Sequence, residues 1–140
     1  PPPAAPGYRQ WRFTRDEYWR LSELGFFSGR KVELIDGEVL TMAAQGNRHQ
    51  AGITLGFLAL DRAFGRGYWV RCQGTLDLSP RSQPDPDLSV TPGDPARPSP
   101  DVPTTALLVV EVSYTTLADD RGWKASLYAA AGIADYWVVD

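Results

Sequence analysis

One apolar segment, residues 106–112, constrains the fold of this chain more than any other part of the sequence. The segment reads ALLVVEV, and every residue in it except Glu111 is apolar. Such a segment is typical of a central strand covered by helices on both faces. A helix is expected next, over residues 119–131 with Gly132 as its stop, followed by a strand over residues 136–139. The strand, helix and strand form a βαβ-like unit, so the sequence predicts an α/β fold with a mixed sheet. The apolar side chains expected on the buried side of the helix are Trp123, Leu127, Ala130 and Ala131.

Two elements are expected in the N-terminal third of the chain. Thr14 and Glu17 have the spacing of a capping box, which predicts a short helix that stops at Gly25. Residues 31–42 then predict a β-hairpin, because the DG pair at 36–37 supplies the residues of a tight turn.

The middle of the chain predicts a second helix and several short strands. Asn47, with Gln50 three residues later, can cap this helix, and Gly65 ends it. Its apolar stripe consists of Ile53, Gly56, Phe57, Leu60 and Phe64. Strands are expected over residues 68–72, 75–78 and 87–91, and the stretch 91–103, which carries five prolines, is expected to be a loop.

Composition excludes several classes of protein. A net charge of −3 and a pI near 5.1 argue against a protein that coats nucleic acid through bulk positive charge, so any contact with a polyanion would be local. The apolar runs are far shorter than the roughly 20 residues that a membrane-spanning helix needs. The single cysteine, Cys72, cannot form an internal disulfide, and no charged-then-apolar leader opens the chain, so a reducing cytoplasm is the expected compartment. One Cys and one His cannot supply the four ligands of a structural zinc site.

Three residues could together carry chemistry. Glu111 lies near the end of a predicted buried strand, where an ionised carboxylate needs a cation, a metal or several hydrogen-bond donors. Asp87 ends the motif Pro84-Asp85-Pro86-Asp87 at the mouth of the neighbouring predicted strand. Two carboxylates at adjacent strand ends suit Mg²⁺ or Mn²⁺. Lys124, on the following helix, could bring an ammonium back to this site, which suits phosphodiester hydrolysis.

Each of these residues also has an ordinary structural interpretation. Glu111 could pair with Arg121 or Lys124 in a structural salt bridge. The other candidates can equally be turn, packing or solvated residues. They are Asp87, Lys124, His49, Glu33 and Glu38.

The combination of several short blocks resembles the Uma-two family of restriction endonucleases, within the PD-(D/E)xK nuclease superfamily. The match runs in order from about residue 32 to residue 140. Its blocks are VELIDGE at 32–38, GNRH at 46–49, PDPD at 84–87, VVEV at 109–112, DRGWK at 120–124, YA at 128–129 and AGIADYWVVD at 131–140.

The resemblance implies a restriction-endonuclease-like core, with a mixed β-sheet flanked by helices and with an N-terminal helix and β-hairpin. It places Asp87 and Glu111 on a Mg²⁺ ion. The superfamily lysine usually stands two residues after the glutamate, where this chain has Ser113, so the resemblance is to the variant in which Lys124 takes that role. Glu33 and His49 match recurrent positions of the family as an extra ligand or proton-transfer group.

These observations predict a metal-dependent endonuclease that hydrolyses DNA, using Mg²⁺ or Mn²⁺ and no small-molecule cofactor. A homodimer is expected, because cutting both strands with one small active site usually calls for two subunits. The alternative is a catalytically inactive nuclease-fold module for nucleic-acid binding or protein interaction. Residues 1–13 are expected to form a flexible proline-rich tail, and residues 14–140 a single domain that is truncated at its C-terminus.

Overall fold

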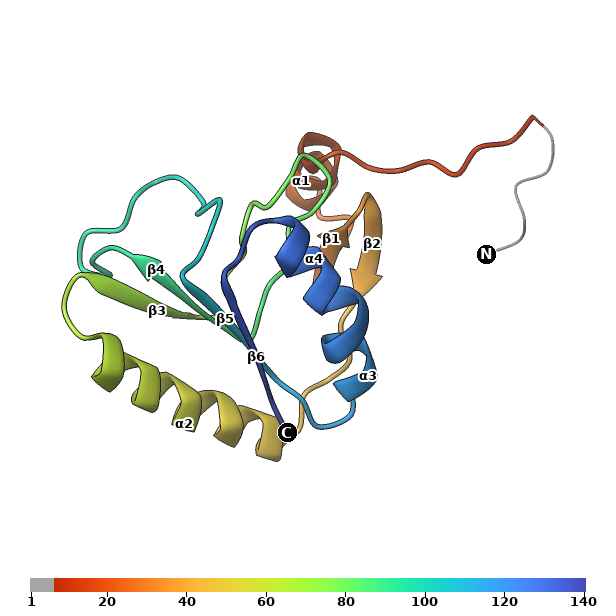
Figure 1. Cartoon of the computed structure of the whole chain (residues 1–140). Helices are drawn as coiled ribbons and strands as arrows, with labels where there is room; N and C mark the ends of the chain where they lie inside the picture. The colour runs from red at the N-terminus through yellow and green to blue at the C-terminus, as the bar shows by residue number, and fades with distance from the viewer. Residues whose placement is uncertain (1–6) are drawn as a thin grey trace.

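A computed structural model of the chain describes residues 7–140, so the expectation for residues 1–6 lies outside the described residues. The strands are β1 (Val32–Ile35), β2 (Glu38–Thr41), β3 (Tyr68–Cys72), β4 (Leu88–Pro92), β5 (Leu108–Val112) and β6 (Asp135–Val139). The helices are α1 (Arg15–Glu23), α2 (Asn47–Phe64), α3 (Leu117–Asp119) and α4 (Ala125–Ala130), with a wide π-type turn, η1 (Asp120–Lys124), between the last two. Figure 1 shows their arrangement.

The main sheet has four strands in the order β3-β4-β5-β6, and β1 pairs with β2 in a separate hairpin. Strands β3, β4 and β5 are antiparallel neighbours, whereas β5 and β6 run parallel. The chain passes from β5 to β6 through α3, η1 and α4, which is the connection that parallel strands require. The predicted α/β fold with a mixed sheet is therefore confirmed.

Helices cover the sheet from both faces. Ile53 and Leu60 of α2 pack against one face, on side chains that include Val90 and Val110. Tyr128 of α4 packs on the opposite face against Val109, and all five residues of β5 are buried. The segment 106–112 is thus almost entirely apolar because helices cover its strand on both faces of the sheet, as the sequence predicts.

The approach of α2 to the sheet depends on a small residue. A Cβ atom at Gly56 would lie 2.7 Å from Leu88 Cδ1, so a larger side chain would push α2 away from β4. Leu88 directly follows Asp87, so this close contact lies beside the strand end that carries the carboxylate.

The N-terminal elements form as expected. Thr14 caps α1, and its capping box with Glu17 is complete. Asp36 and Gly37 both have positive φ, 46° and 79°, which is the conformation of a tight hairpin turn. Residues 10–13 lie along this hairpin, where Arg12 Nη1 contacts Asp36 Oδ2 at 3.0 Å.

Two local predictions in the middle of the chain are wrong. Helix α2 is capped by Gly46 and not by Asn47, and the cap has no side-chain hydrogen bond. Residues 75–78 form no regular strand, because their backbone donors bond to the irregular segments around Pro84 and Pro103. Prolines cannot complete a strand ladder, so the segment is extended without joining the sheet.

The predicted helix over residues 119–131 is also corrected. It is interrupted by η1, in which Gly122 has the non-helical angles φ −98° and ψ −105°. The interruption rotates the second half of the segment, so that Tyr128 is its buried residue, while Trp123 is exposed. Of the side chains predicted on the buried side, Leu127 is half-buried and Ala131 packs against the core, whereas Ala130 is exposed like Trp123. Helical periodicity across residues 119–131 therefore identifies the buried face only in part, and it misses Tyr128.

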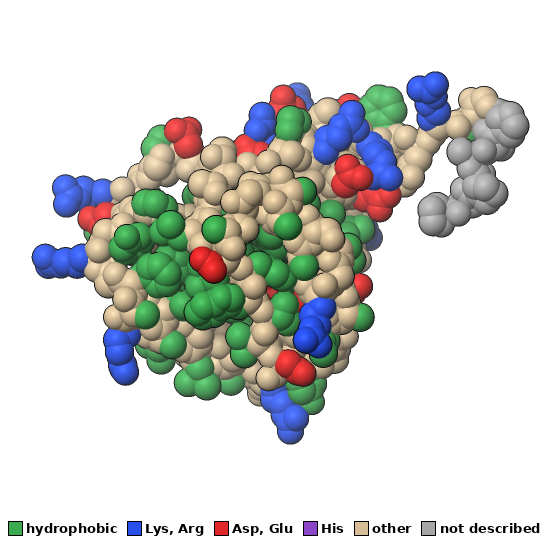
Figure 2. All heavy atoms as spheres, viewed as in Figure 1, with side chains coloured by type: hydrophobic (Ala, Val, Ile, Leu, Met, Phe, Trp, Pro, Cys, Tyr) green, Lys and Arg blue, Asp and Glu red, His purple; other side chains and the backbone are tan. Residues whose placement is uncertain are grey.

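The described surface carries no extended basic face on the side drawn in Figure 2. Lys and Arg side chains are spread along the outline of that face, and hydrophobic side chains gather over its middle. Within residues 7–140, no helix has both the length and the apolarity to cross a membrane.

Candidate active site

Asp87 and Glu111 lie side by side where β4 and β5 leave their shared ladder. The last registered pair is Leu88 with Val110, and the two carboxylate residues come next on either strand. The Val112 N–H donates to Asp87 Oδ2 at 2.9 Å, and the Asp87 N–H donates to Glu111 Oε2 at 3.4 Å. Each carboxylate therefore accepts a hydrogen bond from the other strand, which holds the two side chains together.

Glu111 is buried, with 3% of its surface exposed. Burial raises the pKa of Glu111 to about 8, which the nearby Lys124 charge opposes and the Asp87 charge reinforces. Loss of hydration contributes more to this shift than repulsion between the two carboxylates does.

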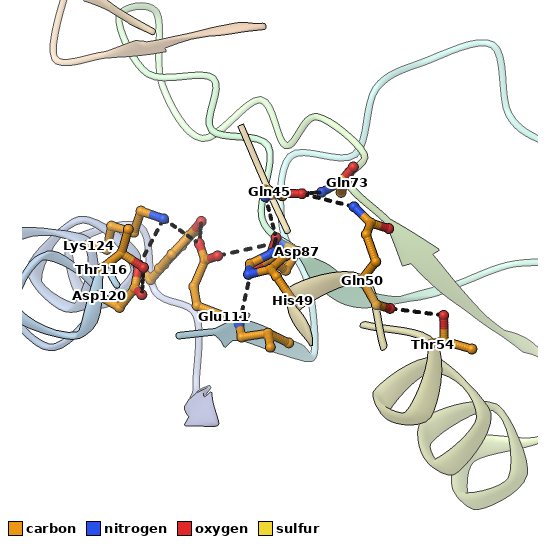
Figure 3. A network of polar contacts seen from close by, with 12 residues as sticks. Gln45, His49, Gln50, Thr54, Gln73, Asp87, Glu111, Thr116, Asp120 and Lys124 are labelled. Atoms are coloured by element: carbon orange, nitrogen blue, oxygen red, sulfur yellow. Dashed lines mark hydrogen bonds and ion pairs between the residues drawn. The ribbon is translucent and has the colours of Figure 1, made fainter. Parts of the chain in front are cut away.

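Lys124 reaches the same cluster from η1. Its Nζ lies 3.4 Å from Glu111 Oε1 and 3.0 Å from Asp120 Oδ1 (Figure 3). Burial alone would lower the pKa of Lys124, but attraction to Glu111 and contact with Asp120 outweigh burial and raise it. The Lys124 ammonium is therefore held in its charged form between the carboxyl groups of Glu111 and Asp120. The salt bridge that the sequence left open for Glu111 exists, and its partner is Lys124.

His49 joins the cluster from the first turn of α2. Its Nε2 lies 3.0 Å from Asp87 Oδ1, and the ring is mostly buried. Gln45, just before α2, donates to the same oxygen at 3.4 Å. Asp87 thus connects the two strand ends to α2.

Glu33 lies beside the cluster without a direct hydrogen bond to its other candidates. It is buried in β1, and its Oε2 accepts the Asp85 N–H at 3.2 Å. Burial raises the pKa of Glu33, and the charge of Lys124 partly opposes this. Glu38 lies elsewhere, on the exposed part of the hairpin, where it pairs with Arg12 at 3.3 Å.

Sequence reasoning missed three residues of this network. Asp120, buried and bonded to Thr116, stands four residues before Lys124, a spacing that places both on one helical face. The Tyr128 O–H donates to Glu111 Oε1 at 3.1 Å, and Tyr128 stands four residues after Lys124. Both could have been found from this spacing. Gln45 lies in an irregular segment and has no comparable sequence signal.

The donor set fits a hard divalent cation. No group of three or more His, Cys, Asp and Glu side chains within residues 7–140 is arranged to hold a metal ion. Mg²⁺, however, is usually bound by one or two protein carboxylates, with water and substrate phosphates completing its shell. Asp87 and Glu111 offer carboxylate oxygens from adjacent strand ends, and the raised pKa of Glu111 marks a buried charge that lacks full compensation.

Two comparisons show which known proteins this chain is similar to. The Uma2 family, described as "Putative restriction endonuclease", matches residues 15–140. A solved structure, that of a putative nuclease belonging to DUF820 from Anabaena variabilis, is similar with a TM-score of 0.67 and 13% sequence identity. The similarity covers 91% of this chain and 74% of that chain, and it shows a shared nuclease fold. No curated protein sequence matches the chain.

Proposed function

Because this chain belongs to the Uma2 family of restriction-endonuclease-like proteins, we propose that it is a metal-dependent endonuclease that hydrolyses DNA phosphodiester bonds. The observation that carries the proposal is the contact network of Asp87, Glu111 and Lys124. It sets two carboxylates and one ammonium at the ends of two adjacent central strands. This combination suits phosphoryl chemistry, in which negative charge develops on the non-bridging oxygens.

Asp87 and Glu111 would hold Mg²⁺ or Mn²⁺. Such an ion supplies Lewis-acid activation of the phosphate and lowers the pKa of a bound water. The two reciprocal hydrogen bonds to Val112 and Asp87 main-chain N–H groups orient the carboxylates before any substrate arrives. This arrangement reduces the reorganisation needed when charge develops.

Lys124 would offset the charge on the phosphate and orient the attacking water. Glu111 and Asp120 hold its Nζ in place, so the ammonium is positioned in advance. His49 would orient water or the phosphate through the ring that contacts Asp87. In the reaction, the water oxygen bonds to phosphorus, the ester P–O bond breaks, and the proton of the water passes to solvent while the leaving oxygen gains one. Glu33 would complete the site as an extra ligand or as a proton-transfer group.

The direct test is cleavage of supercoiled plasmid with Mg²⁺ or Mn²⁺. Asp87→Ala and Glu111→Ala are expected to lower the cleavage rate by at least about a hundredfold, because each removes an oxygen ligand. Asp101→Ala and Glu23→Ala are matched controls, since both side chains are exposed and outside the network. Equal cleavage by all four variants would identify a contaminating nuclease and contradict the proposal.

One observation favours the alternative of a catalytically inactive nuclease-fold module. The Lys124 ammonium is already paired with two carboxylates, and both Asp87 side-chain oxygens have hydrogen-bond partners. Such a network could be purely structural. Salt-dependent DNA binding without cleavage under any divalent ion would favour this alternative.

The proposed enzyme would act as a homodimer, with one active site for each DNA strand. Light scattering at micromolar protein concentration is expected to give twice the mass of the chain. A monomer under conditions that support double-strand cleavage would contradict the dimer.

A further inference from the structure

An open groove of about 540 Å³ lies next to Asp87. Its size is within the range of about 300–1,000 Å³ that is typical of small-molecule sites. Its walls come from residues 29–31 and 41–45, together with Gln50 and Gln73. Figure 3 shows these glutamines on the opposite side of Asp87 from Lys124. The groove is therefore next to the proposed active site but is formed by other residues.

Three glutamine side chains connect the groove to Asp87. Gln45 Oε1 accepts hydrogen bonds from Gln73 Nε2 at 2.6 Å and from Gln50 Nε2 at 3.2 Å. The Nε2 of Gln45 then donates to Asp87 Oδ1 at 3.4 Å. Any ligand that moves the outer two amides would therefore act on a hydrogen bond of the proposed metal ligand.

The outer amides keep unused hydrogen-bonding capacity. A glutamine amide has two N–H donors and one carbonyl acceptor. Within residues 7–140, Gln50 and Gln73 each use one side-chain donor, in the bond to Gln45. A donor and an acceptor from each side chain are thus available to a ligand, which is the pattern needed to bind the edge of a nucleobase.

Gln73 is held in a conformation that rarely suits its residue type. Its φ is 49°, in the left-handed region, and its N–H is fixed by a 3.0 Å hydrogen bond to the Asp87 carbonyl. A non-glycine residue in this region costs free energy, and such residues concentrate at ligand sites. The strained backbone turns the Gln73 amide toward Gln45 and the groove.

The groove also carries positive charge. Arg30 and Lys31 line it, and neither forms an ion pair with a carboxylate of the described part of the chain. The charge of Lys31 lowers the pKa of Glu33 and of Asp85, although burial dominates and raises both. Two cations that form no ion pair within residues 7–140, beside a set of amides, suit a phosphate next to a base.

We propose that this groove binds one nucleotide of the DNA strand, adjacent to the phosphodiester at Asp87. Lys31 and Arg30 contact its phosphate, and the amides of Gln73 and Gln50 bind its base. Gln45 is a positioning residue, because it bonds both to the outer two amides and to Asp87. A nucleotide bound in the groove therefore changes the hydrogen bond from Gln45 to Asp87. The inference rests on the proposed function, which supplies the scissile phosphodiester, and it adds where the neighbouring nucleotide lies.

Binding of a short fluorescein-labelled DNA duplex, followed by anisotropy in EDTA at several salt concentrations, tests this proposal without cleavage. The logarithm of the association constant for DNA falls linearly with the logarithm of the salt concentration. In Lys31→Ala this slope is expected to be less steep by about 0.9, the value for one lost phosphate contact. Gln73→Gly is expected to weaken binding about fivefold to tenfold while leaving the slope unchanged, because a neutral hydrogen bond is lost.

Several variants separate binding from folding. Glycine accepts the positive φ at position 73, so Gln73→Gly is expected to stay folded. Gln73→Asn keeps an amide and also tolerates this φ, so it is expected to lose less affinity than Gln73→Gly. Gln10→Ala, on the exposed hairpin side, and Arg97→Ala, in the loop at the far end of β4, are expected to bind as the parent does.

The outcomes distinguish this proposal from that of hydrolysis. An unchanged salt slope in Lys31→Ala with unchanged affinity in Gln73→Gly would overturn the nucleotide site, and so would a parent protein that does not bind the duplex. If both variants behave as expected but plasmid stays intact with Mg²⁺ and Mn²⁺, the nucleotide site stands and hydrolysis fails. If plasmid is cleaved, Gln73→Gly is expected to raise KM about as much as it weakens binding.

Discussion

Burial is the main physical influence on Glu111, and it gives this one residue a measurable pH signature. The side chain is almost fully enclosed by β5, α4 and the segment that carries Asp87. Its nearest cation, Lys124, is shared with Asp120, so the attraction does not cancel the loss of hydration. Sequence reasoning could identify Glu111 because a single carboxylate in an apolar strand is conspicuous. It could not identify Gln45 or Gln73, whose roles arise from irregular backbone.

Stability is expected to fall as pH rises from about 5 to about 8. The pKa of Glu111 is raised from 4.5 to about 8 in the folded state, so the folded protein binds more protons than the unfolded chain in this window. The stabilisation that comes from protonated Glu111 is complete below the pKa that this residue has in the unfolded chain. It is lost as pH rises through the pKa in the folded protein, and the free energy of unfolding then falls by at most about 1.4 kcal/mol per pH unit.

Urea unfolding at several pH values measures this effect. Glu111→Gln removes the titration, so its free energy of unfolding is expected to decline less across the window than that of the parent. Glu23→Gln, at an exposed position, is expected to follow the parent. Identical pH profiles for the parent and Glu111→Gln would contradict the assignment of the effect to this residue.

Regular elements of this fold could be predicted because their signals are local. The capping box of α1, the turn at 36–37 and the apolar segment around β5 each depend on neighbouring residues alone. The break at η1 could not be predicted, because helical periodicity continues through residues 119–131 while the backbone at Gly122 departs from it. This break sets the direction from which Lys124 meets Glu111.

Gly122→Ala tests the importance of the break. A Cβ atom at Gly122 would meet nothing within 4 Å, so any effect comes from backbone conformation and not from a clash. An alanine disfavours φ −98° and ψ −105° and favours a regular helix, which would rotate Lys124 away from Glu111. We expect a loss of about 1 kcal/mol in the free energy of unfolding and a lower cleavage rate.

Gly46→Ala provides the comparison for this substitution. Gly46 has the extended angles φ −80° and ψ 172° and open space around its Cα, so alanine fits there without strain. Its free energy of unfolding is expected to stay within about 1 kcal/mol of the parent value, because the loss of a favoured N-cap residue and the reduced freedom of the unfolded chain oppose each other. A Gly122→Ala variant as stable and active as the parent would show that the π-type turn is not needed.

At the scale of the whole molecule, the candidate site is assembled from most of the fold. Asp87 directly precedes β4, β5 supplies Glu111, α2 supplies His49, η1 supplies Lys124, and the hairpin supplies Glu33. No single segment contains the site, so it exists only in the folded chain. A ligand that binds these residues therefore binds the folded state and stabilises it.

Divalent metal is accordingly expected to raise the melting temperature. At a Mn²⁺ concentration about 100-fold above its dissociation constant, the stabilisation would be roughly 2.7 kcal/mol, which is several degrees for a domain of this size. Proton release should accompany binding at neutral pH, because the raised pKa of Glu111 leaves much of this carboxyl protonated in the absence of metal.

Glu111→Gln should lose both the temperature shift and the proton release, whereas Glu23→Gln should keep both. If Mn²⁺ leaves the melting temperature of the parent unchanged, the carboxylates and Lys124 form a structural salt bridge only, and the proposal of metal-dependent hydrolysis fails with the metal site.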